Sequence, residues 1–366
     1  MESKQIGKLE AICLILTVII NEIVLNVPNI IILGTGSSSI INVIYVSILA
    51  ILFSILLYKL FNNFSGKDIL DISHFVGGKF FKIFISLIFL TFFLIISSLA
   101  LRYLSNSIKL IYFNNSPLVY LLLFFIIPAI IINKIGFKSI AGLNKIFVFI
   151  VIISILFLLF SSYKHVSLYR IFPILGHGFN TTFIKGSSNI FAFTGLSYLF
   201  LLPPFLKGTD SFKKVTIHST IITALFFVFS ISTLMLTLPV IVNTDEMLSI
   251  YLLTRIIEFG NFLERLDAIF IFDWLLALLS FLSINIFFCI QIFKKMTHIK
   301  DEKVLSSSIG IFIFSGSLLI RNYAQIKFWG NYVYRYGVII LVFIIGLGIL
   351  IAGNIKYRNQ RRFHEN

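Results

Sequence analysis

Residues 11–33 read AICLILTVIINEIVLNVPNIIIL, an apolar run in which a single side chain, Glu22, carries a charge. An α-helix needs about 20 apolar residues to cross the hydrocarbon core of a bilayer, where it satisfies its own backbone hydrogen bonds. The run follows a basic flank, but it is longer than the apolar part of a signal peptide and has no small-residue cleavage motif. It therefore predicts an uncleaved first membrane-spanning helix.

Similar apolar runs recur along the whole chain. Of the 366 residues, 58% are hydrophobic and 12% are charged, and the mean hydropathy is +1.01. A soluble domain has roughly a quarter charged residues, so this composition predicts a chain surrounded mainly by lipid bilayer. No polar stretch is long enough for a soluble domain, and we predict one all-α integral membrane domain over 1–366. Its transmembrane helices, about ten in number, are predicted near 11–33, 40–60, 80–101, 117–133, 145–161, 184–205, 214–241, 266–293, 304–320 and 332–355.

The positions of the basic residues predict the orientation of these spans. The formal net charge is +15, but Lys and Arg lie between the apolar runs and not on one face with interleaved aromatics, so we expect no nucleic-acid partner. Cytoplasmic segments of membrane proteins carry an excess of Lys and Arg. With both termini cytoplasmic, 20 of the 30 basic residues fall on the inner side, in the segments 1–10, 59–82, 134–145, 207–214, 294–303 and 356–362.

Ten spans divide into two sets of five, over about 11–161 and about 184–355. Two consecutive sets with an odd number of spans cross the membrane in opposite directions, as in many secondary carriers. Pro28 and Pro203 each stand shortly before a Gly-Thr pair, near the ends of the first and sixth spans. Chance matches are also expected in so apolar a sequence, so the similar positions of these prolines and Gly-Thr pairs are only a hint of a 5+5 inverted repeat.

Glu22 is the first candidate functional residue, because a charge at the centre of the bilayer costs about 2.5–3.5 kcal/mol. Asn21 precedes it, and Asn26 follows one turn later on the same helical face. Pro28 cannot donate to the helix ladder and so frees backbone carbonyls one turn earlier. These residues predict a helix interrupted around a small polar binding site; the alternative is a proline kink whose glutamate pairs with a neighbouring helix.

The sixth predicted span carries comparable features. Asn189, Thr194 and Ser197 are polar, and Gly195 allows another backbone or a ligand to approach closely. We predict a second interruption near Phe193–Ser197 and include these residues in the candidate ligand site. Small residues also let membrane helices pack together, and on these residues alone packing is the favoured interpretation.

Asp273 is the second acid deep within a predicted span, with Ala277 and Ser280 on the same helical face. Two interpretations stay open for it: a proton or cation site, and a structural pair with a basic residue or a tyrosine of another helix.

The signatures of soluble enzymes are absent from the sequence. No P-loop, GxSxG or GxGxxG motif occurs in a strand-to-helix context, and no two of the six histidines make a metal-like pair. Cys13 and Cys289 lie far apart in separate spans and are interpreted as small buried hydrophobes. We therefore expect no enzymatic activity, no cofactor and no metal site.

Three segments carry a resemblance to a known family: RIFPILGHGF (170–179), IKGSSNIFAFTGLSYLFLLPPFLKG (184–208) and FLERLDAIFIFDWLLALLSF (262–281). They resemble the B subunit of GerA-type spore germinant receptors, the endospore germination permease family of the amino acid–polyamine–organocation superfamily. The matching features are the Pro-x-x-Gly-x-Gly lead-in to span 6, its Gly195 segment ending in prolines, and the E-R-x-D-x-I-F…W run that opens span 8. Length and span number agree over the whole chain.

The resemblance implies a LeuT-like fold in which broken helices 1 and 6 form a ligand site near the midplane. It further implies a small-molecule germinant such as an amino acid, and partner A and C subunits in the inner membrane of a spore. The sequence departs from the family pattern at two places. Asn21 and Glu22 stand where a Gly-rich break is usual, and Ser197 stands where a Glu often follows the span 6 glycine.

Two functions remain open on the sequence: a ligand-sensing subunit of a receptor, and a free-standing ion-coupled amino acid transporter. Both use the same fold, and a fold does not decide function. The family resemblance favours the sensor.

Overall fold

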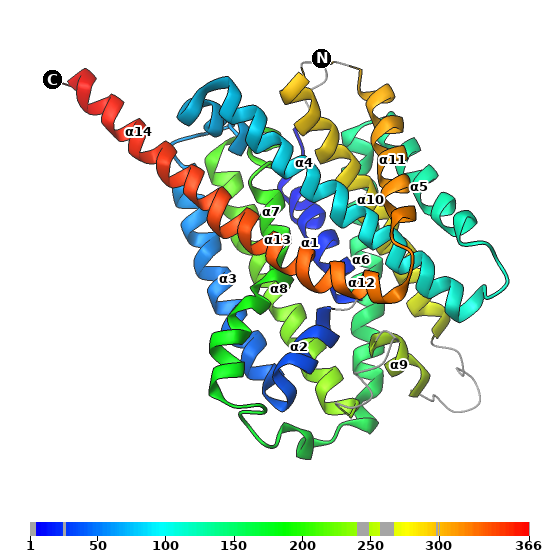
Figure 1. The fold of residues 1–366 in the computed structure, drawn as a ribbon. Coiled ribbons are helices and arrows are strands. Elements are labelled where there is room, and N and C mark those ends of the chain that lie inside the picture. The colour runs from blue at the N-terminus through cyan, green and yellow to red at the C-terminus, as the bar shows by residue number, and fades with distance from the viewer. Residues whose placement is uncertain are drawn as a thin grey trace.

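The computed structural model describes residues 5–24, 27–239, 249–256, 267–297, 299 and 301–365. Within these ranges the regular elements are all helices, as the composition predicts, and they form one bundle (Figure 1). The longer helices are α1 (Lys8–Val24), α3 (Ser39–Phe61), α4 (Ile69–Tyr112), α5 (Leu118–Ile135), α6 (Phe137–Ser161), α8 (Gly208–Thr237), α10 (Asp267–Thr297), α11 (Glu302–Leu319) and α14 (Leu347–Glu365).

Eight segments of the described chain are long and apolar enough to cross a membrane: Val27–Phe61, Ile69–Tyr112, Leu118–Ile135, Phe137–His165, Gly208–Thr237, Asp267–Thr297, Glu302–Leu319 and Ala324–Arg361. They correspond to predicted spans two to five and seven to ten. The predicted first and sixth spans differ because each is divided into pieces shorter than the roughly 20 residues that a crossing needs. The all-α membrane fold is confirmed, with eight candidate spans among the described residues.

The first span contains two described helices, with Glu22 near the end of the first one. Helix α1 ends at Val24, and α2 (Val27–Thr35) begins after two residues that lie outside the described part of the chain. Pro28 is the second residue of α2, in the first helical turn, where a missing N–H is tolerated.

The sixth span is divided more finely. A 3₁₀ segment, η5 (Lys185–Phe193), leads through Thr194 into the single turn and a half of α7 (Gly195–Leu199). Two prolines then begin a further 3₁₀ turn, η6 (Pro203–Phe205), before α8 starts at Gly208. The interruption predicted near Phe193–Ser197 is thus present in the backbone.

Helix α4 is much longer than the predicted span 80–101. It contains 44 residues and is kinked at Gly78, whose φ of 76° is readily adopted only by glycine. Asp68 caps its first turn by accepting from the backbone N–H groups of Leu70 and Asp71. The helix extends beyond the apolar run because the cap and the amphipathic first turns before the kink add length that hydropathy does not reveal.

The last span alternates between two helix types. Helix α12 (Tyr323–Trp329) passes into the π-helical turn η8 (Gly330–Tyr334), then α13 (Arg335–Ile339), the π-helical segment η9 (Ile340–Gly346) and finally α14. In a π-turn the N–H bonds the carbonyl five residues earlier, and such turns occur frequently at functional sites.

Helix α1 lies inside the bundle, where it packs against α6, α7, α8 and α10. The most apolar stretch of α10 is 83% buried and that of α5 only 28%, so α10 is internal and α5 lies at the edge, as Figure 1 shows. The broken spans therefore occupy the interior, which is where a ligand site shielded from lipid has to be.

Charged residues from distant segments meet at one end of the bundle. Lys295 Nζ lies 2.7 Å from Asp68 Oδ2 and 2.6 Å from Asp71 Oδ2. Lys356 donates to the backbone carbonyl of Phe75 (2.8 Å). All of these residues belong to segments predicted to be cytoplasmic, and both ends of the chain lie toward the same end of the bundle (Figure 1).

Candidate functional site

Glu22 lies in the last turn of α1 and is 2% exposed, so its carboxylate faces the protein interior. Its side chain interacts with the hydroxyl of Tyr334, the last residue of η8. The Tyr334 hydroxyl also lies 2.5 Å from Oγ1 of Thr194, at the interruption of span 6. One tyrosine therefore connects a buried acid of span 1 with the break of span 6.

A second polar chain begins one residue further along the last span. The Arg335 guanidinium donates to Oδ1 of Asn189 on η5. Asn189 Nδ2 donates to Oδ1 of Asn42 on α3 (2.7 Å), and Asn42 Nδ2 donates to the backbone carbonyl of Thr182 (2.7 Å). Spans 2, 6 and 10 are thereby held together by neutral amides and one guanidinium.

Phe191 separates these two chains and touches both of them. Its ring stands edge-on to that of Tyr334, with centroids 5.8 Å apart, and the guanidinium carbon of Arg335 lies 5.3 Å from the ring centroid. A cation at this distance from an aromatic face is attracted by the ring quadrupole. Phe191 thus fixes the relative positions of the tyrosine and the arginine.

Three other predicted residues have local roles in the structure. Phe193 packs against Phe227 of α8, with centroids 5.7 Å apart, and Ser197 Oγ donates to the carbonyl of Thr194 (2.7 Å). Gly195 lies so close to α1 that an added Cβ would be 2.8 Å from Ile19 Cδ1. At this point the two broken spans are in direct contact, which agrees with the packing role that the sequence favoured.

Asp273 lies on α10 and is fully buried, and neither of its carboxylate oxygens has a hydrogen-bond partner within the described ranges. The hydroxyl of Ser154 on α6 is nearby but donates to the carbonyl of Ile150 (2.9 Å). No contact between described residues connects Asp273 to Glu22. It is therefore a second polar feature, separate from the tyrosine-centred cluster.

Asn21 is also fully buried, and its amide oxygen and nitrogen both lack a partner in the described chain. Asn26, the remaining predicted site residue, lies outside the described residues. The structure thus brings together Glu22 and Thr194 through Tyr334, and Asn189 with Arg335. The assignment of the nine predicted residues to one ligand site stays a prediction.

Tyr334, Arg335 and Asn42 were missed by the sequence reasoning. Arg335 offered a signal, because it is a basic residue inside the predicted span 332–355 and a charge at depth is expensive. Tyr334 and Asn42 offered no signal, since neutral polar residues are common in membrane helices and their partners lie far away in sequence.

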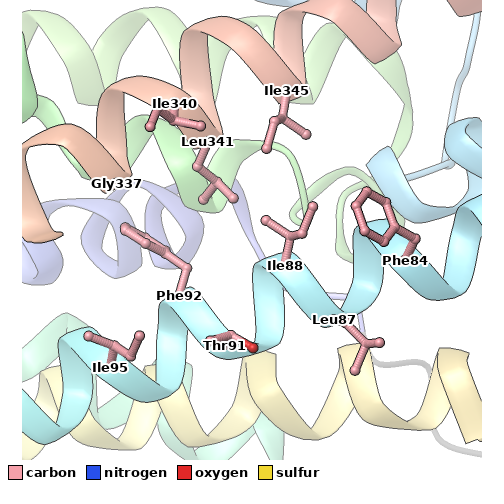
Figure 2. Close-up of a pocket in the computed structure, with 10 residues that line it drawn as sticks. All are labelled: Phe84, Leu87, Ile88, Thr91, Phe92, Ile95, Gly337, Ile340, Leu341 and Ile345. Carbon is pink, nitrogen blue, oxygen red and sulfur yellow. The ribbon is translucent and has the colours of Figure 1, made fainter.

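An apolar groove lies on another part of the molecule, between α4 and the last span (Figure 2). Its volume is about 410 Å³. Figure 2 shows that the hydroxyl of Thr91 is its one polar side-chain group, among Phe84, Leu87, Ile88, Phe92, Ile95, Ile340, Leu341 and Ile345. Without a charge it offers nothing to the ammonium or carboxylate of a polar ligand, so the polar cluster remains the candidate site.

Comparison with known sequences agrees with the resemblance. Residues 5–324 match a family model described as "Spore germination protein". "Spore germination protein B2" of Bacillus subtilis (strain 168) is 24% identical over 211 residues, which is 57% of each chain. "Putative spore germination protein YfkT" of the same organism is 24% identical over 263 residues, 70% of each chain. The first match spans little more than half the length of that relative.

Solved structures of transporters share the fold. A Na⁺-coupled sialic acid symporter in a substrate-bound, outward-open state superposes with a TM-score of 0.69 at 14% identity, covering 93% of this chain and 80% of the symporter. A mutant manganese transporter of Eremococcus coleocola superposes with a TM-score of 0.58 at 12% identity, covering 96% and 76%. At these identities the likeness concerns the fold alone, which is the LeuT-like fold.

Proposed function

The chain belongs to the spore germination protein family, and we propose that it is the membrane subunit of a germinant receptor that binds a small germinant such as an amino acid. Binding takes place at the tyrosine-centred cluster between the broken spans and triggers germination. The A and C subunits of the receptor are its partners, in the inner membrane of the spore. Both termini face the cytosol.

The interaction between Glu22 and Tyr334 is the observation that supports this proposal most directly. A buried carboxylate in a membrane protein is expensive and needs a partner. Here the partner is a neutral hydroxyl, which leaves the charge of the acid uncompensated. The ammonium group of an amino acid supplies the missing charge and forms a stronger, charge-assisted hydrogen bond.

Signalling follows if the ligand favours one arrangement of the spans over another. A ligand shifts a conformational equilibrium only by its difference in affinity for the two states. An ammonium group that takes the place of Tyr334 on Glu22 releases the tyrosine, and with it the last span, from the first span. The partner subunits would sense this change in the relative position of spans 1, 6 and 10.

Substitution of Glu22 by Gln tests the proposal, since Gln keeps the shape of the side chain and loses its charge. We expect spores carrying Glu22→Gln to need at least tenfold more germinant for half-maximal germination, about 1.4 kcal/mol, at unchanged receptor abundance. Glu10→Gln is the matched control, because Glu10 is on the same helix and only accepts from the backbone N–H of Gly7. Normal germination of Glu22→Gln spores would make Glu22 a structural residue.

A free-standing, ion-coupled amino acid transporter is the second candidate function. The buried and unpartnered carboxylate of Asp273 favours it, because a coupled carrier needs a site for its proton or cation. The experiment that separates the two functions is uptake into liposomes that contain the purified chain alone. Sustained accumulation of an amino acid without the partner subunits would establish the carrier and overturn the sensor.

A further inference from the structure

Arg335 brings a positive charge into the same cluster and has only neutral partners there. Its guanidinium donates to the amide oxygen of Asn189 and lies against the ring of Phe191. Its Nε is buried and has no hydrogen-bond partner. Arginine stays protonated in proteins, so this charge cannot be removed by loss of a proton.

No carboxylate of the described chain forms an ion pair with Arg335. The acid on the neighbouring span, Glu22, interacts with Tyr334 instead. A charge withdrawn from water and left without a counter-charge destabilises the folded protein. The guanidinium is therefore held in place by neutral groups but lacks the anion that would compensate it.

The acid and the guanidinium each contact one member of the same aromatic pair. Tyr334 reaches Glu22 with its hydroxyl, Arg335 is the next residue of the chain, and Phe191 contacts both of these side chains. Successive residues of a helix point about 100° apart. A ligand in this cluster therefore meets a negative charge on one side and a positive charge on another.

We propose that Arg335 binds the carboxylate of the germinant while Glu22 binds its ammonium group, so that the site selects a zwitterion with a free carboxylate. This inference rests on the proposed function, because it assigns the ligand contacts of that same site. The planar guanidinium suits a carboxylate, since two parallel N–H···O bonds can form. In this arrangement one ligand compensates both charges, that of Glu22 with its ammonium group and that of Arg335 with its carboxylate.

The experiment compares the acid with its uncharged derivative. The full-length chain in lipid nanodiscs is exposed to each of the twenty standard amino acids and to the carboxamide of each one, and binding is measured directly. For every amino acid that binds, we expect the carboxamide to bind at least tenfold more weakly. Spores with the complete receptor provide the second measurement, as the concentration of acid or carboxamide that gives half-maximal germination.

Variants of Arg335 test whether this residue causes the preference for the free carboxylate. We expect Arg335→Gln to weaken binding of the amino acid at least tenfold and to leave binding of the carboxamide unchanged. The amino acid affinity of Arg335→Lys should lie between those of the wild type and Arg335→Gln. Arg102→Gln is the matched control, because Arg102 also has a buried Nε without a partner but donates to the backbone carbonyl of Arg321, away from the cluster. Arg102→Gln should change the affinity for neither the amino acid nor the carboxamide.

Two outcomes overturn the inference while the proposed function stands: the wild-type chain binds acid and carboxamide equally well, or Arg335→Gln weakens both to the same extent. The first comparison uses only the wild-type chain, so it decides the matter even if Arg335→Gln does not fold. A receptor that responds to nucleosides or sugars and to no amino acid would overturn both the inference and the amino acid assignment.

Discussion

The hydroxyl of Tyr334 lies 2.5 Å from Oγ1 of Thr194 and also interacts with the carboxylate of Glu22. A tyrosine hydroxyl has one proton and cannot donate to both. When Tyr334 donates to the Glu22 carboxylate, Thr194 has to donate to Tyr334 and gives up its 2.7 Å bond to the carbonyl of Phe191. The protonation or occupancy of Glu22 is therefore linked to the backbone at the break of span 6.

Removal of this hydroxyl should uncouple the two spans. Tyr334→Phe keeps the ring against Phe191 but removes the polar group that interacts with the buried carboxylate of Glu22, which costs about 1–3 kcal/mol. We expect a lower unfolding temperature in detergent. Tyr332→Phe is the control, since Tyr332 is 56% exposed, and it should leave the unfolding temperature unchanged.

A double-mutant cycle makes this prediction specific. If Tyr334 stabilises the protein through Glu22, the effects of Glu22→Gln and Tyr334→Phe should not add, with a coupling of at least about 0.5 kcal/mol. Strictly additive effects would show that the hydroxyl acts independently of the acid.

The contact between the two broken spans gives a prediction about packing. Gly195→Ala places a Cβ 2.8 Å from Ile19 Cδ1, so we expect a loss of about 1–3 kcal/mol in stability. Ile19→Val should restore part of the loss because it shortens the side chain that the new methyl group meets. Gly142→Ala in α6 is the control: no heavy atom lies within 4 Å of its added Cβ, and it should be neutral or stabilising. Equal thermal stability of Gly195→Ala and wild type would contradict the tight contact.

Substitution of Asp273 should raise the stability of the protein and at the same time impair its function. Because its carboxylate is buried without a partner, Asp273→Asn should raise stability by at least about 1 kcal/mol. If the acid is kept for function, the same variant should respond less well to germinant or lose ion-dependent uptake. Asp267→Asn, at the outer end of the same helix, removes an acid that accepts from Tyr112 and should not stabilise the protein. A less stable Asp273→Asn would show that the carboxylate has a structural partner.

The orientation of the chain can be tested by cysteine labelling. Cys13 and Cys289 are buried, so a membrane-impermeant thiol reagent should give little background. Asn115 and Ser65 are both exposed, in loops at opposite ends of α4. With cytoplasmic termini, Asn115→Cys should react from outside in intact cells and Ser65→Cys only after permeabilisation. The reverse pattern would refute the predicted topology.

The membrane fold and the helix interruption of span 6 were predictable because they depend on local properties. Hydropathy locates the spans, and Pro28 and Gly195 mark positions where a helix cannot continue normally or where another segment packs closely. The extent of α4 was not predictable in this way, because its capped and kinked first turns are not continuously apolar.

The composition of the site was only partly predictable for a different reason. Glu22 stands out in the sequence because a charge within a span is rare. Tyr334 is an ordinary residue for a membrane helix until it is placed beside Glu22, and their separation of more than 300 residues is bridged only in the folded protein. Polar contacts between helices depend on the packing of the whole bundle, which no single segment encodes.

The two π-helical segments of the last span have a mechanical consequence. Each holds an extra residue compared with an α-helical turn, and η8 and η9 enclose α13 from both sides. If an extra residue is passed from one π-turn to the other, the segment between the two turns rotates by about 100° while the helix stays unbroken. Tyr334 and Arg335 sit at that junction, so a small rotary step of the span would swing both away from their partners together. The two π-helical segments therefore allow the short segment between them to rotate without breaking the last span.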